Sequence, residues 1–152
     1  MNFSIRKMTA EDVPAVAALD QISFSLPWPE RSFHFEVTGN PASRCWVAEA
    51  DGRVAGMIVA WLFVDEVHIA TLATHPDFRR QGIAQELLTH TLRYTHDEGA
   101  VTSFLEVRES NLAAQEMYRK FGYESTGRRK RYYKDNDEDA ILMTLSKIEV
   151  DK

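Results

Sequence analysis

The chain has 152 residues, of which 44% are hydrophobic and 27% are charged, as expected of one globular domain spanning residues 1–152. The formal net charge of −5 argues against nucleic-acid binding, and no apolar run approaches the roughly 20 residues that span a bilayer. The single cysteine, Cys45, excludes an internal disulfide, and neither cysteine nor histidine spacing predicts a zinc or other metal site. With no recognisable signal peptide, this composition favours a cytoplasmic protein.

The first third of the chain predicts a strand, two helices and a hairpin. Residues 3–8 predict the strand, and Thr9 is a candidate N-cap for the first helix. Two prolines end that helix, and the second of them, Pro29, can begin a short second helix. Asp51-Gly52 is typical of a two-residue hairpin turn, and it joins strands predicted at residues 44–50 and 54–63.

The next stretch combines a buried strand, a turn and a helix. An apolar run at residues 67–74 predicts the strand, and Arg79-Arg80-Gln81-Gly82-Ile83-Ala84 then opens a segment of helical period that ends near Gly99. The first N–H groups of a helix have no internal partner, so this arrangement can bind an anion. Gly82 would let a phosphate approach the backbone, although an ordinary helix start is the alternative.

The rest of the chain predicts three strands and one helix, at residues 101–107, 112–121 (the helix), 123–126 and 140–145. The charged residues 128–131 and 134–139 are interpreted as the connection between the last two strands. The order of strands and helices predicts an α/β fold with a mixed sheet.

Arg-x-x-Gly-x-Ala after a strand resembles the pyrophosphate loop of the GCN5-related N-acetyltransferases, the GNAT family, and the order of elements is similar over nearly the whole chain. The resemblance implies a central, twisted, mostly antiparallel sheet flanked by helices, with acetyl-CoA as acetyl donor. It implies that the pyrophosphate is held by Arg79, Arg80, Gln81, Gly82, Ile83 and Ala84. Ala84 departs from the glycine that is common at that position in the family.

The same resemblance assigns the end of the buried strand to the pantetheine arm of the donor. In this family the strand splays from its neighbour, so the backbones of Leu72, Ala73 and Thr74 would pair with the arm, and one N–H would polarise the thioester oxygen. The alternative is a fully paired central strand. Asn111 has two compatible interpretations, as a helix cap and as a hydrogen-bond partner of the donor.

Glu106 is the candidate general base. It stands in an apolar strand, where a carboxylate is costly unless it is used or paired, and burial would raise its pKa in the direction that a base requires. An ion pair with Arg108 on the same face is the alternative. Leu-Glu-Val-Arg followed by Ser-Asn resembles the ribosomal-protein-alanine N-acetyltransferases, in which the corresponding glutamate acts as the base, directly or through water.

Tyr118 is the candidate general acid, because a phenol can donate a proton to a departing thiolate. Ala114 and Phe121 lie on the same helical face, so a buried core aromatic is the alternative. The family places a thiol-facing tyrosine at this point of the Tyr-x-x-x-Gly-Tyr/Phe pattern, here residues 118–123, and the resemblance therefore favours the acid.

Two further stretches resemble protein N-terminal acetyltransferases. Leu26, Pro27 and Trp28 occupy the loop that lines the peptide groove in those enzymes, and Tyr132 and Tyr133 correspond to tyrosines that bind the substrate backbone. The alternative is that these aromatic side chains only cover the core. The basic run before Tyr132 has no assigned role.

The sequence therefore predicts transfer of acetyl from acetyl-CoA to the N-terminal α-amine of a protein, with ribosomal protein S18 as the model acceptor that the resemblance implies. The expected partner is a protein or peptide N-terminus, without nucleic acid or membrane, and the expected state is a monomer or weak dimer. Two alternatives stay open. One is an enzyme of the same fold acting on lysine or a small amine, and the other is a non-catalytic acetyl-CoA-binding module.

Overall fold

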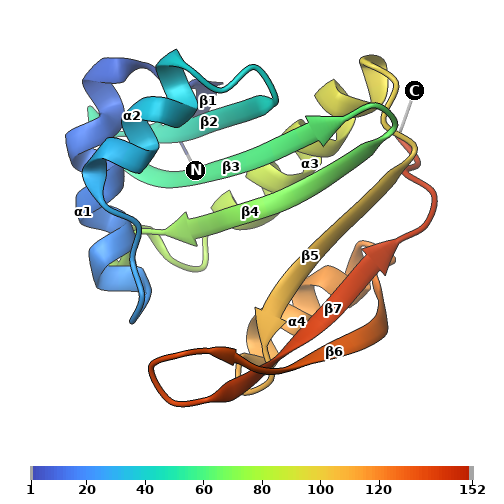
Figure 1. Cartoon of the computed structure of the whole chain (residues 1–152). Coiled ribbons are helices and arrows are strands. Elements are labelled where there is room, and N and C mark those ends of the chain that lie inside the picture. The colour runs from blue at the N-terminus through green and yellow to red at the C-terminus, as the bar shows by residue number, and fades with distance from the viewer. Residues whose placement is uncertain (1, 151–152) are drawn as a thin grey trace.

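The computed structural model describes residues 2–150, which build one seven-stranded sheet in the order β1-β2-β3-β4-β5-β7-β6 (Figure 1). Only β4 and β5 are parallel, so the predicted mixed, mostly antiparallel sheet with helices is confirmed. The strands are β1 (Ser4–Lys7), β2 (Ser43–Ala50), β3 (Arg53–Phe63), β4 (Glu66–Thr74), β5 (Thr102–Arg108), β6 (Glu124–Tyr133) and β7 (Glu138–Leu145). The helices are α1 (Val13–Ser23), α2 (Glu30–Thr38), α3 (Ile83–Asp97) and α4 (Leu112–Lys120), with short 3-10 turns at Ala10–Asp12 and Pro76–Phe78.

Two hydrophobic clusters cover the two faces of the sheet. Alternate side chains of each strand point to opposite faces, and neighbours on β2 divide accordingly: Val47 belongs to the cluster of α1 and α2, and Trp46 to the cluster of α3 and α4. Both α3 and α4 therefore lie on one face, and α1 and α2 on the other (Figure 1). No helix within residues 2–150 is long and apolar enough to cross a membrane.

The predicted order of elements is confirmed, and local chemistry explains several boundaries. Asp51 and Gly52 both have positive φ, 54° and 72°, which is the backbone of the tight hairpin turn that joins β2 and β3. Thr9 is the N-cap of the 3-10 turn just ahead of α1, where the Asp12 side chain accepts a hydrogen bond from the Thr9 N–H at 2.8 Å, and Asp12 is the N-cap of α1 itself.

One expectation about the last strands is wrong. Residues 128–131 do not form a connection but continue β6, where Arg128 pairs with Ile141 and Arg129 with Ala140 of β7. β6 is an edge strand, so its basic side chains are exposed to solvent and do not interfere with the hydrogen bonds between β6 and β7. A run of charge was therefore a poor guide to the end of this strand.

Candidate active site

β4 and β5 diverge in the middle of the sheet. Their parallel ladder runs from Glu66 with Thr102 to His68 with Phe104 and ends there. A β-bulge follows in β4, because Val59 of β3 pairs with Thr71 whereas Ala60 pairs with Ile69. The end of β4 therefore keeps its ladder to β3 but has none to β5, so the alternative of a fully paired strand is wrong. The two ribbons spread apart in Figure 1.

A pocket of about 220 Å³ lies where these strands part. Its walls come from the end of α1 and the following loop, from β4 and β5, from the first turns of α4 and from the end of β6. The structure thereby brings together predicted residues from distant parts of the chain: Leu26, Trp28, Leu72, Glu106, Asn111, Tyr118 and Tyr133.

Glu106 is held by a histidine that the sequence analysis did not identify. His68 Nε2 lies 2.8 Å from Glu106 Oε1, and Arg129 Nε lies 3.7 Å from Glu106 Oε2. An ionised carboxylate only accepts hydrogen bonds, so His68 Nε2–H is the donor. The ring of His68 also stacks on Phe104 with centroids 4.6 Å apart, which fixes its orientation. A titratable side chain inside an apolar strand was the signal that could have revealed His68.

The pKa of Glu106 is lowered, whereas the sequence analysis expected burial to raise it. The hydrogen bond from His68 is the largest cause, and it outweighs the opposing effect of burial. Glu106 is thus ionised at neutral pH and ready to accept a proton.

The alternative pair of Glu106 with Arg108 does not form. Arg108 instead contacts Asp135 at 3.1 Å and Glu138 at 3.2 Å, and its guanidinium lies 4.0 Å from the centroid of the Tyr133 ring. Arg108 therefore anchors the β6–β7 loop and one aromatic wall of the pocket. Burial raises the pKa of Tyr133 to about 12, so this phenol keeps its proton at neutral pH.

Tyr118 lines the pocket from α4 and is only 8% exposed. Burial raises its pKa well above the ordinary value, so the phenol remains protonated and able to donate. Its ring packs edge-on against Tyr123 with centroids 5.6 Å apart. Both interpretations of Tyr118 are compatible with this position, because the ring is part of the core and the residue faces the pocket.

Asp20 lines this pocket, and the sequence analysis did not identify it either. It is 2% exposed at the end of α1, and its Oδ2 accepts a hydrogen bond from the Trp28 N–H at 2.7 Å. Burial raises its pKa. This bond ties the loop of Leu26, Pro27 and Trp28 back to α1 and so shapes the pocket wall.

The loop before α3 leads into a helix start whose first backbone N–H groups have no partner inside the helix. Arg80 and Gly82 have φ of 65° and 78°, and the first hydrogen bond of α3 runs from Glu86 N–H to the Gly82 carbonyl at 3.0 Å. The N–H groups of residues 83–85 precede that bond and have no acceptor within the helix. Arg79 and Arg80 are exposed beside them, so the residues present suit a pyrophosphate.

Several predicted residues lie outside the pocket around Glu106. Ala73 and Thr74 continue β4 from the pocket toward the loop at residues 79–84. Tyr132 is 46% exposed and packs edge-on against Tyr133. Asn111 caps α4, since its Oδ1 accepts a hydrogen bond from the Ala114 N–H at 3.2 Å, and it also lines the pocket, so its role as a helix cap is confirmed.

A loop that suits a pyrophosphate, a strand edge without a ladder partner, and a glutamate and a tyrosine lining one pocket are typical of a coenzyme A-dependent acyltransferase. The family model described as Acetyltransferase (GNAT) family matches residues 13–123, and the chain belongs to this family. A Bacillus subtilis (strain 168) protein, provisionally named a ribosomal protein bS18-alanine N-acetyltransferase, is 37% identical over 94% of this chain and 95% of its own length. The ribosomal protein bS18-alanine N-acetyltransferase of Salmonella typhimurium is 34% identical, covering 93% of this chain and 96% of that protein.

A solved structure agrees with these sequence relatives. The crystal structure of the ribosomal-protein-S18-alanine N-acetyltransferase from Escherichia coli superposes with a TM-score of 0.89 and 29% identity, covering 99% of this chain and 97% of that chain.

Proposed function

We propose that this protein transfers acetyl from acetyl-CoA to the α-amine of a protein N-terminus, with alanine of a ribosomal protein of the S18 type as acceptor. The observation that carries the proposal is the meeting of Glu106 and Tyr118 in the pocket where β4 parts from β5. The names of the relatives, which specify alanine of ribosomal protein bS18, support this choice of acceptor.

Glu106 accepts the proton that the amine loses as it attacks the thioester. A carboxylate with a lowered pKa is a weak base, and an α-amine needs only a weak one. The reference pKa of an α-amine is about 7.7–8.0, against about 10.4 for lysine, so roughly a tenth of α-amines are already neutral at pH 7. This match favours an α-amine over a lysine side chain.

Tyr118 donates its proton to the departing thiolate, and its buried phenol keeps that proton at neutral pH. Leu72, Ala73 and Thr74 have no ladder to β5, so the backbone groups on that edge of β4 face the cleft and are available to the pantetheine arm and the thioester oxygen. Residues 79–84, which follow this same end of β4, bind the pyrophosphate.

Peptide acetylation followed by mass spectrometry tests the proposal. A peptide with a free N-terminal alanine and no lysine is expected to gain one acetyl group. The same peptide with a blocked N-terminus and an internal lysine is expected to react at least about tenfold more slowly, a difference near 1.4 kcal/mol in transition-state binding. Equal or faster reaction of the blocked peptide contradicts the α-amine assignment.

A further inference from the structure

We propose that an aromatic surface formed by Trp28, Phe35 and Trp61, here called the aromatic platform, binds the acceptor chain a few residues beyond its reacting N-terminus. The platform favours large apolar or aromatic side chains at those positions. This inference rests on the proposed function, because it extends the acceptor site of the same reaction.

The platform is continuous with the acid–base site through a row of rings. Trp28 and Trp61 stack with centroids 6.1 Å apart and planes 6° from parallel. Trp61 packs against His68 at 5.3 Å, and His68 is the residue that donates to Glu106. The row therefore leads from the catalytic carboxylate across β4 and β3 to the loop between α1 and α2.

A shallow, open hollow of about 520 Å³ lies over this surface, and Trp28 lines both the hollow and the pocket around Glu106. Phe35 is 54% exposed at the edge of the hollow, which leaves a large apolar ring in contact with solvent. The centroids of neighbouring rings in the row lie 5.3 and 6.1 Å apart. An extended chain advances roughly 3.3 Å per residue, so about the third to fifth residues of an acceptor reach the platform.

The platform is held in place before any acceptor binds. Trp61 Nε1 donates to Glu36 Oε1 at 2.6 Å, and Asn40 Nδ2 donates to the same carboxylate at 3.1 Å. Glu36 is 7% exposed beneath the rings. A preorganised aromatic surface binds with a smaller loss of side-chain entropy than a mobile one.

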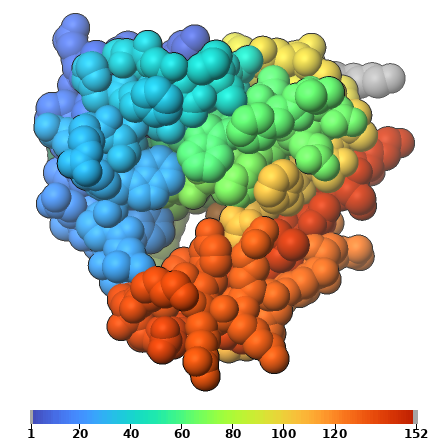
Figure 2. All heavy atoms as spheres, viewed as in Figure 1, coloured from blue at the N-terminus to red at the C-terminus, as the bar shows by residue number. Residues whose placement is uncertain are grey.

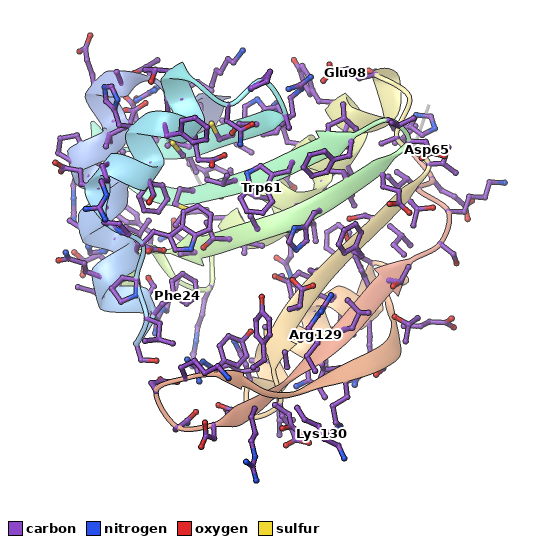
Figure 3. All side chains as sticks on the ribbon, viewed as in Figure 1. Phe24, Trp61, Asp65, Glu98, Arg129 and Lys130 are labelled. Atoms are coloured by element: carbon purple, nitrogen blue, oxygen red, sulfur yellow. The ribbon has the colours of Figure 1, made fainter. Side chains whose placement is uncertain are left out.

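The acceptor chain has to leave the pocket across this face. Ser25 and Arg108 both hydrogen-bond to Asp135, which ties the α1–α2 loop to the β6–β7 loop and closes the cleft on that side. Figure 2 shows an opening between the blue and green part of the chain and the orange part. In the same view, Figure 3 places Trp61 and Arg129 on opposite sides of that opening, with Trp61 on the side of the platform.

Steady-state kinetics with three acceptors test this assignment. The acceptors are an alanine tripeptide amide, an octapeptide with alanine first and phenylalanine at positions three to five, and the same octapeptide with serine at those positions. The wild-type protein is expected to use the phenylalanine octapeptide with a KM about tenfold lower than the serine octapeptide. Phe35→Ala and Trp61→Ala are expected to remove most of that difference while the KM of the tripeptide stays within about twofold.

Phe63→Ala is the matched control, because Phe63 is a 53% exposed aromatic two residues after Trp61, at the end of β3, and it does not line the hollow. It is expected to leave all three KM values unchanged. Trp61→Ala can also disturb His68, so the deciding value is the ratio of the KM values of the two octapeptides. Phe35→Ala repeats the test at a residue that is not part of the row of rings leading to His68.

Two outcomes overturn the inference. Equal KM values of the two octapeptides with the wild-type protein mean that the platform does not bind the acceptor, and an unchanged ratio in both variants means the same. In either case, acetylation of the tripeptide leaves the proposed function intact. Failure of every free N-terminus to react contradicts both proposals.

Discussion

At the residue scale, Glu106 shows that a specific partner can outweigh burial. The carboxylate lies in an apolar strand, but His68 approaches it from the adjacent β4 and Arg129 from β6 at the edge of the sheet. These partners favour the ionised form by more than burial disfavours it. Glu106 is therefore ionised at neutral pH, which is the state that the proposed base requires.

His68→Phe is expected to move the acid limb of the activity profile to higher pH. It removes the hydrogen bond that most lowers the pKa of Glu106, so this pKa rises and the base is lost by protonation at a less acidic pH. The activity at pH 5–6 should fall more than the activity at pH 8, as measured by kcat/KM across pH. His68→Gln keeps a donor and should shift the limb less. Identical limbs for the wild type and His68→Phe would exclude Glu106 as the group that titrates there.

Val64 is a residue whose backbone conformation conflicts with its side chain. It has φ of 56° in the turn between β3 and β4 and is 92% exposed, so no packing compensates for the strain. Val64→Asn is expected to stabilise the protein by about 1 kcal/mol, because asparagine adopts this conformation more readily. Chemical denaturation measures the change. Val64→Thr retains the branched Cβ and should give no gain, and a gain equal to that of Val64→Asn would argue against backbone strain.

At the scale of elements, the site depends on how closely α3 approaches the sheet. Gly56 of β3 has no side chain, and a Cβ there would lie 2.7 Å from Ile83 Cγ2 and 3.1 Å from the Ala73 carbonyl oxygen. The first turn of α3 therefore packs directly over β3 and β4. This contact places the start of α3 near the end of β4. In the predicted donor site, the start of α3 binds the pyrophosphate and the end of β4 binds the pantetheine arm.

Gly56→Ala is expected to destabilise the protein by about 1–3 kcal/mol, because the added methyl overpacks the contact between β3 and α3. It should also weaken acetyl-CoA binding, as measured by calorimetric titration, because α3 moves relative to β4. Gly127→Ala is the control, since its Cβ would come no closer than 3.6 Å to Leu142. Equal stability losses in the two variants would mean that the close approach at Gly56 is not the cause.

At the scale of the whole molecule, segments from distant parts of the chain meet around Arg108. Its side chain joins the α1–α2 loop, through Ser25, to the β6–β7 loop, through Asp135, and to the start of β7, through Glu138. The two loops that the resemblance assigns to the acceptor are therefore held by one residue of β5. Acceptor binding should depend on this tie more than donor binding does.

Arg108→Gln is expected to raise the KM of a free N-terminal peptide by about tenfold, because Asp135 and Glu138 lose their cationic partner and Tyr133 loses its stacked guanidinium. The Kd of acetyl-CoA should change by less than about twofold. Arg128→Gln removes an arginine that pairs with Glu109 and Asp139 on the exposed edge strand, and it should change neither value. Parallel losses of donor and acceptor binding in Arg108→Gln would indicate a general loss of the fold.

The sequence by itself determined the order of elements, the loop that suits a pyrophosphate and the two residues, Glu106 and Tyr118, that meet in the pocket. The order of elements, the loop and Glu106 come from local causes: hydrophobic period, turn residues and a carboxylate in an apolar strand. Tyr118 was favoured only by the resemblance to the GNAT family. The residues that pair with the Glu106 carboxylate were identified only in the tertiary structure. His68 and Glu106 are 38 residues apart in sequence, and they meet because β4 pairs with β5 in parallel for a short distance and then parts.

Long-range strand pairing also explains the two wrong expectations, which concerned the pKa of Glu106 and the extent of β6. The direction of the pKa shift of Glu106 depends on which charges lie across the sheet, and no local pattern of residues specifies them. The extension of β6 through residues 128–131 depends on its place at the sheet edge, where basic side chains are solvated whatever the ladder does. Strand pairing is a long-range property, so the tertiary structure alone decided which side chains share the site and which protonation state the base adopts.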